Sequence, residues 1–483
     1  MFKHLKQLAK ESLVYGISGI VGGFIGTLLV PIYTRIFNPS DYGVLDLVGL
    51  CSSIIGVFIV LGFDVSQGYY FYRTDDIEDK KLTLSISAIS HIVMGIILAI
   101  PLLLFSGEIS KIALGTSDYA KYFRLVALDL PFFAILAFAQ RVLRLIRSPW
   151  RYMLLAISSL LSNIVLTILM VVVWRKGIYG IYLSKLIVDI LFSFVALYLI
   201  KSWIGKYFSF FRLKQLLAYG VPIVPAGISQ WALDSVNRYF LRYYSSLSDV
   251  GLYAIGGKVA SIMGLLTGAF QLAWGPFAFS IHREDNSRAI YASILTYYLV
   301  LTSGFAIILS LFAPEILKIF TTKAYYGASV VVSYLTYVMI AQGTYFIVSI
   351  GVSLVKKTAH ISWTTAVAAG LNMGLNFLLI PKFGMIGAAA VALVSKWVST
   401  VLLYLVSQHY YPIPYRLKDV GIILGSSAIL IFLGSQIKFF HFWFMFLSKS
   451  GLFLIYILII FTARIIKLDS LLRFFPKYAG KTG

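Results

Sequence analysis

The segment Leu28-Leu-Val-Pro-Ile-Tyr-Thr-Arg-Ile-Phe-Asn-Pro-Ser-Asp-Tyr-Gly-Val-Leu-Asp-Leu47 separates two long apolar runs near the start of the chain. Asn38 can cap a helix, Pro39 suits the first helical position, and Asp41 would lie in the first turn, where a negative charge is favoured. The segment therefore predicts the end of one helix and the start of another.

A related pattern returns about 208 residues later, as expected of a helical unit used twice. Asn38-Pro-Ser-Asp-Tyr-Gly-Val-Leu aligns with Ser246-Leu-Ser-Asp-Val-Gly-Leu-Tyr, which pairs Asp41 with Asp249 and Gly43 with Gly251. Arg35 has a loose counterpart in Arg242.

Two further echoes have nearly the same offset. Leu145-Ile-Arg-Ser-Pro-Trp corresponds to Leu354-Val-Lys-Lys-Thr-Ala, and Arg175-Lys-Gly-Ile-Tyr-Gly corresponds to Lys382-Phe-Gly-Met-Ile-Gly, pairing Gly177 with Gly384. The three echoes together predict an internal duplication of the chain.

The composition indicates a membrane protein. Hydrophobic residues make up 59% of the chain and charged residues only 12%, about half the charged fraction of a soluble domain. Apolar runs of bilayer length recur throughout, and they are too long for barrel strands, so we expect an all-α polytopic fold. About fourteen spans are predicted, at 12–35, 41–66, 82–105, 118–143, 152–174, 178–200, 214–241, 248–274, 290–312, 326–351, 358–380, 384–407, 419–437 and 444–465.

The distribution of lysine and arginine predicts the orientation of these spans. With the N-terminus in the cytoplasm, 25 of the 41 basic residues lie in cytoplasmic segments, 12 lie on the opposite side and four lie inside spans. This bias predicts a multi-pass protein of the cytoplasmic membrane with both termini cytoplasmic. Most of the net charge of +22 is then explained by basic residues that orient the spans in the membrane. No loop is large enough to form a basic module that would bind nucleic acid.

Six spans return the chain to its starting side, so the two halves should share one orientation. We expect an N-lobe at 1–212 with spans 1–6, a C-lobe at 213–415 with spans 7–12, and spans 13–14 with a basic tail at 416–483. Spans 13 and 14 have no counterpart in the repeat and are expected to be an appendage. Parallel repeats place a binding cavity between the halves near the midplane.

Charged residues inside spans are costly and therefore mark candidate sites. Two pairs of opposite charges lie one helical turn apart, Lys185 with Asp189 and Asp234 with Arg238. In each pair the two charges can either neutralise each other or face a cavity. Asp64 and Asp129 have no opposite charge at helical spacing. They are candidates for proton or sodium coupling, or for pairing with a lysine of the cavity.

Lys258 and Lys396 are single charges in otherwise apolar spans, and we expect both to face the cavity as cations for an anionic ligand. Arg35 could line the cavity or anchor at the lipid headgroups. Spacing places Arg141, Arg144 and Arg147 on one helix face at the cytoplasmic mouth, where they either attract an anionic headgroup or only orient the chain.

The chain resembles the polysaccharide flippases of the MOP superfamily, in their Wzx-like branch. The features that carry this resemblance are the duplicated spans followed by two further spans, the stretch from Pro31 to Gly43, and the paired Gly-Ile-Tyr-Gly and Gly-Met-Ile-Gly links. This resemblance implies a V-shaped, two-lobed transporter that works by alternating access. It implies movement of a polyprenyl-diphosphate-linked oligosaccharide, the repeat unit of an O-antigen, capsule or exopolysaccharide, from the cytoplasmic to the outer leaflet. The implied partners are membrane lipids, that substrate, and a polysaccharide polymerase with its chain-length machinery.

Two other classes of function compete with a flippase. A MATE-like, cation-coupled exporter of small organic molecules would suit an acidic cavity, whereas the candidates here are mostly cationic. A membrane-embedded polymerase or glycosyltransferase would carry a large outer loop or an acidic cluster. No nucleophile elbow, phosphate-binding loop or metal spacing is visible, so we expect a transporter without a catalytic site, metal or cofactor, driven by a proton gradient, a sodium gradient or the membrane potential.

Overall fold

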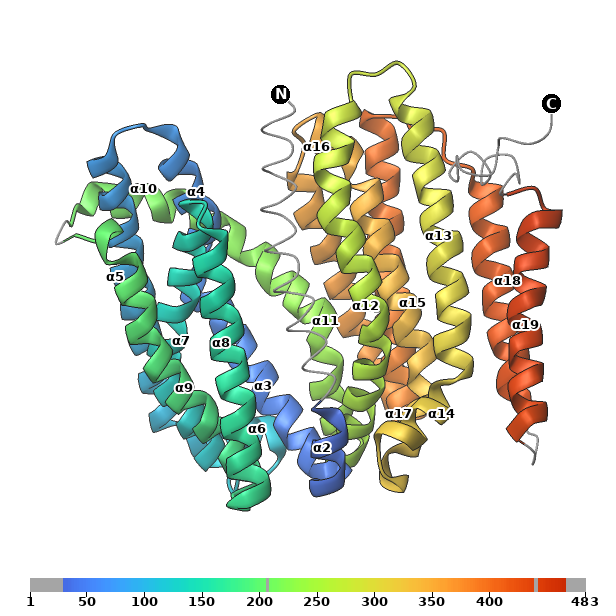
Figure 1. Ribbon diagram of the computed structural model, residues 1–483, viewed down its shortest axis with the longest axis horizontal. Helices are drawn as coiled ribbons and strands as arrows, with labels where there is room; N and C mark the ends of the chain where they lie inside the picture. The colour runs from blue at the N-terminus through green and yellow to red at the C-terminus, as the bar shows by residue number, and fades with distance from the viewer. Residues whose placement is uncertain (1–28, 206–207, 438–441, 466–483) are drawn as a thin grey trace. The chain divides into compact units, whose positions relative to one another are not determined.

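The computed structural model describes residues 29–205, 208–437 and 442–465, which form helices and no β-strand. The first α-helices are α2 (Val30–Ile36), α3 (Pro39–Val60), α4 (Phe63–Arg73), α5 (Ile77–Leu104), α6 (Ser106–Leu114), α7 (Ala120–Leu145), α8 (Pro149–Ile168), α9 (Gly177–Ile200), α10 (Phe210–Gly220) and α11 (Val224–Tyr244). The later ones are α12 (Leu247–Ile281), α13 (Ser287–Leu311), α14 (Ala313–Phe320), α15 (Ser329–Val348), α16 (Ile350–Leu354), α17 (Ala359–Tyr410), α18 (Leu417–Gln436) and α19 (Phe442–Thr462) (Figure 1). The π-helix η1 (Leu169–Val173) and the 3-10 helices η2 (Lys201–Trp203), η3 (Val221–Ile223) and η4 (Lys323–Ala328) complete the set.

Twelve helical segments in these ranges are long and apolar enough to cross a bilayer. One of them, α17, has 52 residues and contains one non-helical residue, Gly384, so it comprises the two predicted spans 358–380 and 384–407. The predicted span 12–35 lies mostly outside the described residues. The predicted all-α polytopic membrane fold is confirmed.

The chain packs into two compact units. The first extends to Ala254 and includes Asn376–Gly384, and the second contains Ile255–Leu375 and the chain from Met385 onward. Packing compactness is a different criterion from sequence duplication, so the boundaries predicted from the repeat, at 212/213 and 415/416, stay predictions.

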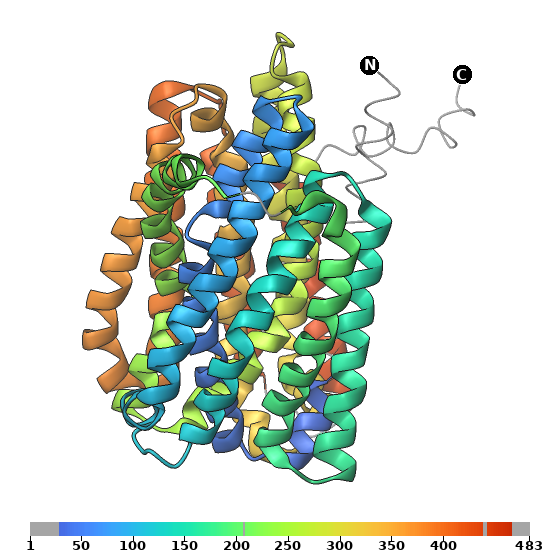
Figure 2. The ribbon, with the colours of Figure 1, turned by 90° about the vertical axis from the view of Figure 1, so that its left-hand side faces the viewer.

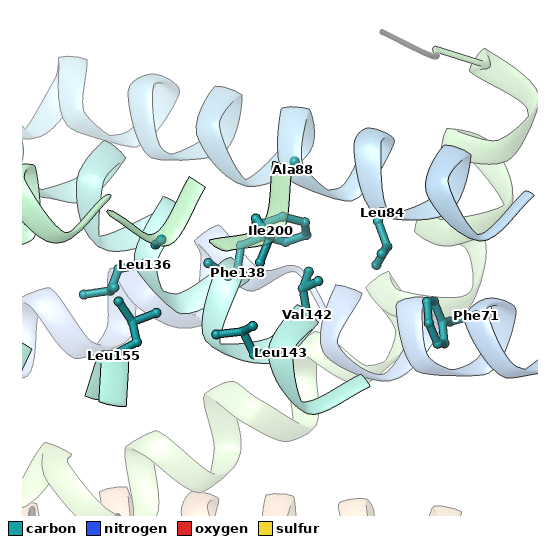
Figure 3. Close-up of a cluster of buried hydrophobic side chains, with 11 residues drawn as sticks. Phe71, Leu84, Ala88, Leu136, Phe138, Val142, Leu143, Leu155 and Ile200 are labelled. Atoms are coloured by element: carbon teal, nitrogen blue, oxygen red, sulfur yellow. The ribbon is translucent and has the colours of Figure 1, made fainter. Parts of the chain in front are cut away.

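The first unit is organised around α7, which packs against α5 on one side and α9 on another (Figure 2). Phe138, Val142 and Leu143 of α7 are fully or almost fully buried. They meet Leu84 of α5 and Ile200 of α9 in one apolar cluster (Figure 3). In a bilayer the gain comes from close van der Waals packing, because lipid tails are as apolar as these side chains.

The second unit has α13 at its centre, in contact with α15, α18 and α19. The hydroxyl of Tyr456 on α19 donates to the Val300 carbonyl of α13 at 3.0 Å. Spans 13 and 14 therefore pack against this unit, and their place outside the repeat stays a prediction.

Lys449 corrects the orientation count in one place. It is one of the 12 basic residues counted on the side opposite the cytoplasm, but it lies inside α19, is only 4% exposed and pairs with Glu315 of α14 at 2.8 Å. A carboxylate from a neighbouring helix makes a buried lysine tolerable there.

The start of α3 agrees with its sequence. The Asn38 side chain accepts from the Asp41 amide at 2.9 Å, and the Asp41 carboxylate accepts from the Asn38 amide at 3.3 Å, forming a capping box before Pro39. In the echo, the Ser246 hydroxyl accepts from the Asp249 amide at 3.1 Å, so α12 begins in a related way.

The two later echoes share unusual backbone geometry. Arg147 and Lys356 have φ of 51° and 58°, and Gly177 and Gly384 have φ of 58° and 53°. The amide after Arg147 bonds to the Leu143 carbonyl, and the amide after Lys356 bonds to the Val352 carbonyl, so both helices end in a Schellman motif.

This geometry corrects one prediction about the arginines. The helix α7 ends at Leu145, so Arg147 does not share a helix face with Arg141 and Arg144. The chain leaves the helix there because Pro149 disfavours helical backbone in the residue before it and itself opens α8.

Two long segments of the first unit are bent at one place. Leu61 and Gly62 both have left-handed backbone between α3 and α4, and Val221–Ile223 forms a 3-10 turn between α10 and α11. The Gly62 backbone lies directly against that of Gly220, with no room for a side chain on either glycine. Beyond the bend, α4 carries the aromatic run Tyr69–Tyr72.

Candidate functional site

The first unit contains a cleft of about 640 Å³ between α3, α7 and the start of α11. Small residues on α3 create the space, because glycine and serine leave the helix surface hollow. The lining residues include Gly49, Ser52, Ser53, Gly56, Phe133, Ala137, Arg141, Val224 and Gly227. This volume is typical of sites for small polar and amphipathic ligands.

One end of the cleft carries an ion pair. Arg141 Nη1 on α7 lies 3.1 Å from Asp64 Oδ2 on α4, and both side chains line the cleft. The pair is partly open, with 24% of the arginine and 37% of the aspartate side chain exposed. Exposed pairs contribute little stability, so this arginine can exchange its carboxylate for another anion at small cost.

A second set of charges lies behind the wall of the cleft. Lys185 Nζ on α9 donates to Asp189 Oδ2 at 2.7 Å and also to the carboxylate of Asp129 on α7. Lys185 Nζ lies 5.2 Å from the centre of the Phe133 ring, which lines the cleft. The lysine side chain is 37% exposed, whereas those of Asp129 and Asp189 are 4% and 11% exposed. One cation therefore serves two buried acids and reaches toward the cleft from between them.

Arg238 has a partner that the sequence did not identify. Its Nε lies 3.4 Å from Asp46 Oδ2 on α3, and its guanidinium lies 5.7 Å from the centre of the Tyr253 ring. Asp234, the expected partner one turn away, accepts a hydrogen bond from Gln230 Nε2 at 2.5 Å. An acid inside the apolar span 41–66, away from both of its ends, was the available signal for Asp46.

An aromatic side chain also belongs to this region. Trp231 Nε1 on α11 donates to Ser53 Oγ at 2.8 Å, which fixes the indole beside the cleft residues of α3. Trp231 and Tyr239 have ring centres 6.1 Å apart. Such surfaces suit stacking of a sugar ring against an aromatic face.

The other predicted cations are not among the residues of this cleft. Arg35 is exposed on α2, and Arg144 is exposed with its guanidinium 5.5 Å from the centre of the Tyr152 ring. In the second unit Lys258 is exposed on α12, whereas Lys396 is only 3% exposed on α17. The two lysines, both predicted as single charges in apolar spans, thus have different surroundings. The described residues contain no group of three or more histidine, cysteine or acidic side chains arranged to hold a metal ion.

Solved structures with the same fold are transporters. The chain aligns with a structure titled lipid II flippase MurJ, inward closed conformation, with a TM-score of 0.75 and 17% identity over 95% of this chain and 100% of that one. It also aligns with an inward-facing MATE family transporter of the MOP superfamily, with a TM-score of 0.66 and 15% identity over 79% of this chain and 93% of that one. These likenesses show that the chain has the polytopic helical fold of these transporters.

Sequence relatives narrow this class. A family model described as polysaccharide biosynthesis protein matches residues 32–330, which is more than half of the chain. The chain therefore belongs to the polysaccharide biosynthesis protein family. The predicted polysaccharide-biosynthesis family is confirmed.

Two curated relatives are similar over part of their length. The Lsg locus putative protein 1 of Haemophilus influenzae is 21% identical over 291 residues, 58% of this chain and 68% of that protein. The probable low-salt glycan biosynthesis flippase Agl15 of Haloferax volcanii is 22% identical over 242 residues, 44% of this chain and 51% of that protein.

Proposed function

We propose that this protein moves a polyprenyl-diphosphate-linked oligosaccharide from the cytoplasmic to the outer leaflet of the cytoplasmic membrane. The observation that carries the proposal is the cleft of the first unit, where Arg141 and the neighbouring Lys185 offer cations inside a membrane-spanning bundle. A diphosphate needs such cations, and lysine and arginine are the residues that bind phosphate. The name of the Haloferax relative, a glycan biosynthesis flippase, supports the same substrate class.

The residues of the cleft would bind different parts of the substrate. Arg141 would exchange Asp64 for a phosphate oxygen, and Lys185 would approach the second phosphate past Phe133. Trp231, held by Ser53, would stack on the first sugar. The polyprenyl chain would stay in the lipid, because only the polar head needs a path out of the hydrocarbon.

Ion coupling would arise at Lys185. While the lysine contacts both Asp129 and Asp189, two acids share one positive charge. A phosphate that attracts the lysine leaves the acids less neutralised, which favours the uptake of a proton or a sodium ion by a carboxylate. Release of the phosphate would reverse this exchange, so substrate and cation would move in linked steps.

The remaining predicted residues keep supporting roles in this proposal. Lys258 and Arg35 are exposed cations available to the diphosphate or to an acidic sugar, whereas Arg238 and Lys396 are more buried. Arg144 and Arg147 would attract the headgroup at the cytoplasmic end. Transfer of the exported unit to a polymerase with its chain-length machinery would follow on the outer side.

A second candidate function is export of a small organic cation. The two acids around Lys185 favour it, because a net negative charge would hold a cationic solute. The MATE-like fold neighbour is compatible with either substrate, since its likeness concerns the fold alone.

Reconstitution of the full chain in liposomes separates the two functions. A polyprenyl diphosphate carrying a fluorescent sugar should become accessible to an external quencher faster with the wild type than with Lys185→Ala or Arg141→Ala. Lys111→Ala, an exposed lysine away from the cleft, is the control and should transport normally. Absence of flipping together with uptake of an organic cation would overturn the flippase proposal. In cells, removal of the protein should accumulate the lipid-linked intermediate on the cytoplasmic leaflet.

A further inference from the structure

A second hollow, of about 520 Å³, lies in the first unit at the other end of α7 from Arg141. Lys121 at the start of α7 lies 20 residues before Arg141, or about 30 Å along a helix. The hollow is lined by Lys121, by Arg175 and Lys176 before α9, and by Asp41 at the start of α3. Three cations from two distant parts of the sequence thus meet around one space.

The charges in this hollow are not balanced. Lys121, Arg175 and Lys176 are exposed, and the described part of the chain gives none of them an ion pair. Lys121 Nζ lies 5.3 Å from the centre of the Tyr122 ring. The one acid, Asp41, already accepts the Asn38 amide in the capping box. An excess of positive charge around a concave surface favours binding of an anion.

Backbone amides add to the positive character of the hollow. The Lys176 amide bonds to the Met170 carbonyl, and Arg175 and Gly177 both have positive φ, so the chain reverses sharply after η1. The helix α9 then begins at Gly177, with no side-chain cap on its first amides. Free amides at a helix start favour an anion, in addition to the three side chains.

Apolar side chains border the basic residues. Ile36 and Val172 line the hollow and are 43% and 45% exposed, and Val173 and Trp174 next to them are 61% and 55% exposed. The hollow thus places cations beside exposed apolar side chains at the end of membrane-spanning helices. The cations suit the phosphate headgroup of a lipid, and the apolar side chains suit the upper part of its acyl chains.

We propose that this hollow binds the phosphate headgroup of an anionic membrane lipid, at the end of the bundle opposite Arg141. The lipid would neutralise Lys121, Arg175 and Lys176 and fix the turn between η1 and α9. The inference stands on the residues of the hollow and does not depend on the transported substrate.

The test uses the full chain in nanodiscs of phosphatidylcholine with or without phosphatidylglycerol. Lipids retained on the purified protein are measured by native mass spectrometry for the wild type and for a triple Lys121→Gln, Arg175→Gln, Lys176→Gln variant. The matched control replaces three exposed lysines elsewhere, Lys111, Lys318 and Lys323, by glutamine. Thermal unfolding in phosphatidylcholine alone checks that all three proteins are folded.

We expect the wild type and the control to retain phosphatidylglycerol in preference to phosphatidylcholine. In the triple variant, the ratio of retained phosphatidylglycerol to phosphatidylcholine should fall at least about tenfold. Equal loss in the control, or no preference in the wild type, would overturn the proposal. Two further arms identify the source of the phosphate. Displacement by inorganic phosphate alone would overturn the lipid assignment in favour of a free anion, whereas displacement only by a polyprenyl diphosphate would support a lipid phosphate site and assign it to the carrier lipid.

Discussion

Gly43 and Gly251 face each other where the start of α3 crosses the start of α12. A side chain on Gly43 would overlap the Leu247 carbonyl, and one on Gly251 would overlap the Pro39 carbonyl. The contact is reciprocal, because each glycine meets the residue that corresponds to the other's partner in the duplicated sequence. The two helix starts therefore touch through backbone on both sides, with no room for a side chain on either glycine.

The first prediction concerns this crossing. Gly43→Ala and Gly251→Ala should each destabilise the protein by about 1–3 kcal/mol, because the new methyl group meets backbone that cannot rotate away. Thermal unfolding in detergent measures the effect. Gly268→Ala on α12 is the control, since no atom lies near its added methyl group. Equal melting temperatures for Gly251→Ala and Gly268→Ala would contradict the close contact.

The second prediction concerns Lys185. Lys185→Gln leaves Asp129 and Asp189 without their shared cation, and loss of one partner of a buried pair costs about 3–5 kcal/mol. Adding Asp129→Asn should restore part of the lost stability, which a double-mutant cycle measures. Transport should stay absent in the double variant, because the cation is still missing. Additive losses of stability would show that the two residues are not coupled.

The third prediction separates binding from stability at Arg141. Arg141→Gln should change the free energy of unfolding by less than about 1 kcal/mol, because the pair with Asp64 is partly exposed. Transport should nevertheless fall at least about tenfold if the arginine binds phosphate. Lys81→Gln, which removes a similarly exposed pair with Glu78, is the control and should leave transport unchanged. Parallel losses in both variants would argue against a binding role for Arg141.

The fourth prediction uses the contrast between two lysines. Lys258→Ala should leave the melting temperature unchanged, because the side chain is exposed, and it should abolish transport if the lysine binds the substrate. Lys396→Ala should lower the melting temperature, because the side chain is buried. Lys→Arg should rescue transport in part at position 258. Normal transport by Lys258→Ala and Lys396→Ala would remove both from the binding site and favour the exporter alternative.

The fifth prediction concerns orientation. Reporter fusions after Lys81 and after Arg147 should report the cytoplasm, and a fusion after Lys111 should report the exterior, because basic residues concentrate on the first of these sides. Reversed signals would contradict the predicted topology.

Local rules predicted the local features of this protein. The cap formed by Asn38 and Asp41 and the couple of Lys185 with Asp189 follow from spacings of three and four residues, which depend only on helix geometry. The apolar runs likewise predicted the spans, because their length is set by the bilayer.

Local spacing rules could not predict ion-pair partners that come from other helices. Asp129 lies 56 residues before Lys185, and Asp46 lies 192 residues before Arg238, so only tertiary packing brings them together. The same applies to Glu315, which keeps Lys449 inside the membrane bundle. The position of Arg147 depended on where α7 ends, and the ends of helices are the least certain part of a pattern-based prediction.

The contact between Gly62 and Gly220 has a mechanical consequence for the cleft. Gly62 and the nearby residues Ile223 and Val224 line the cleft, so its width depends on the angles at both bends. Because backbone touches backbone there, one helix cannot straighten without pushing the other. We therefore expect the two bends to move together, so that any change in the width of the cleft involves both helices at once.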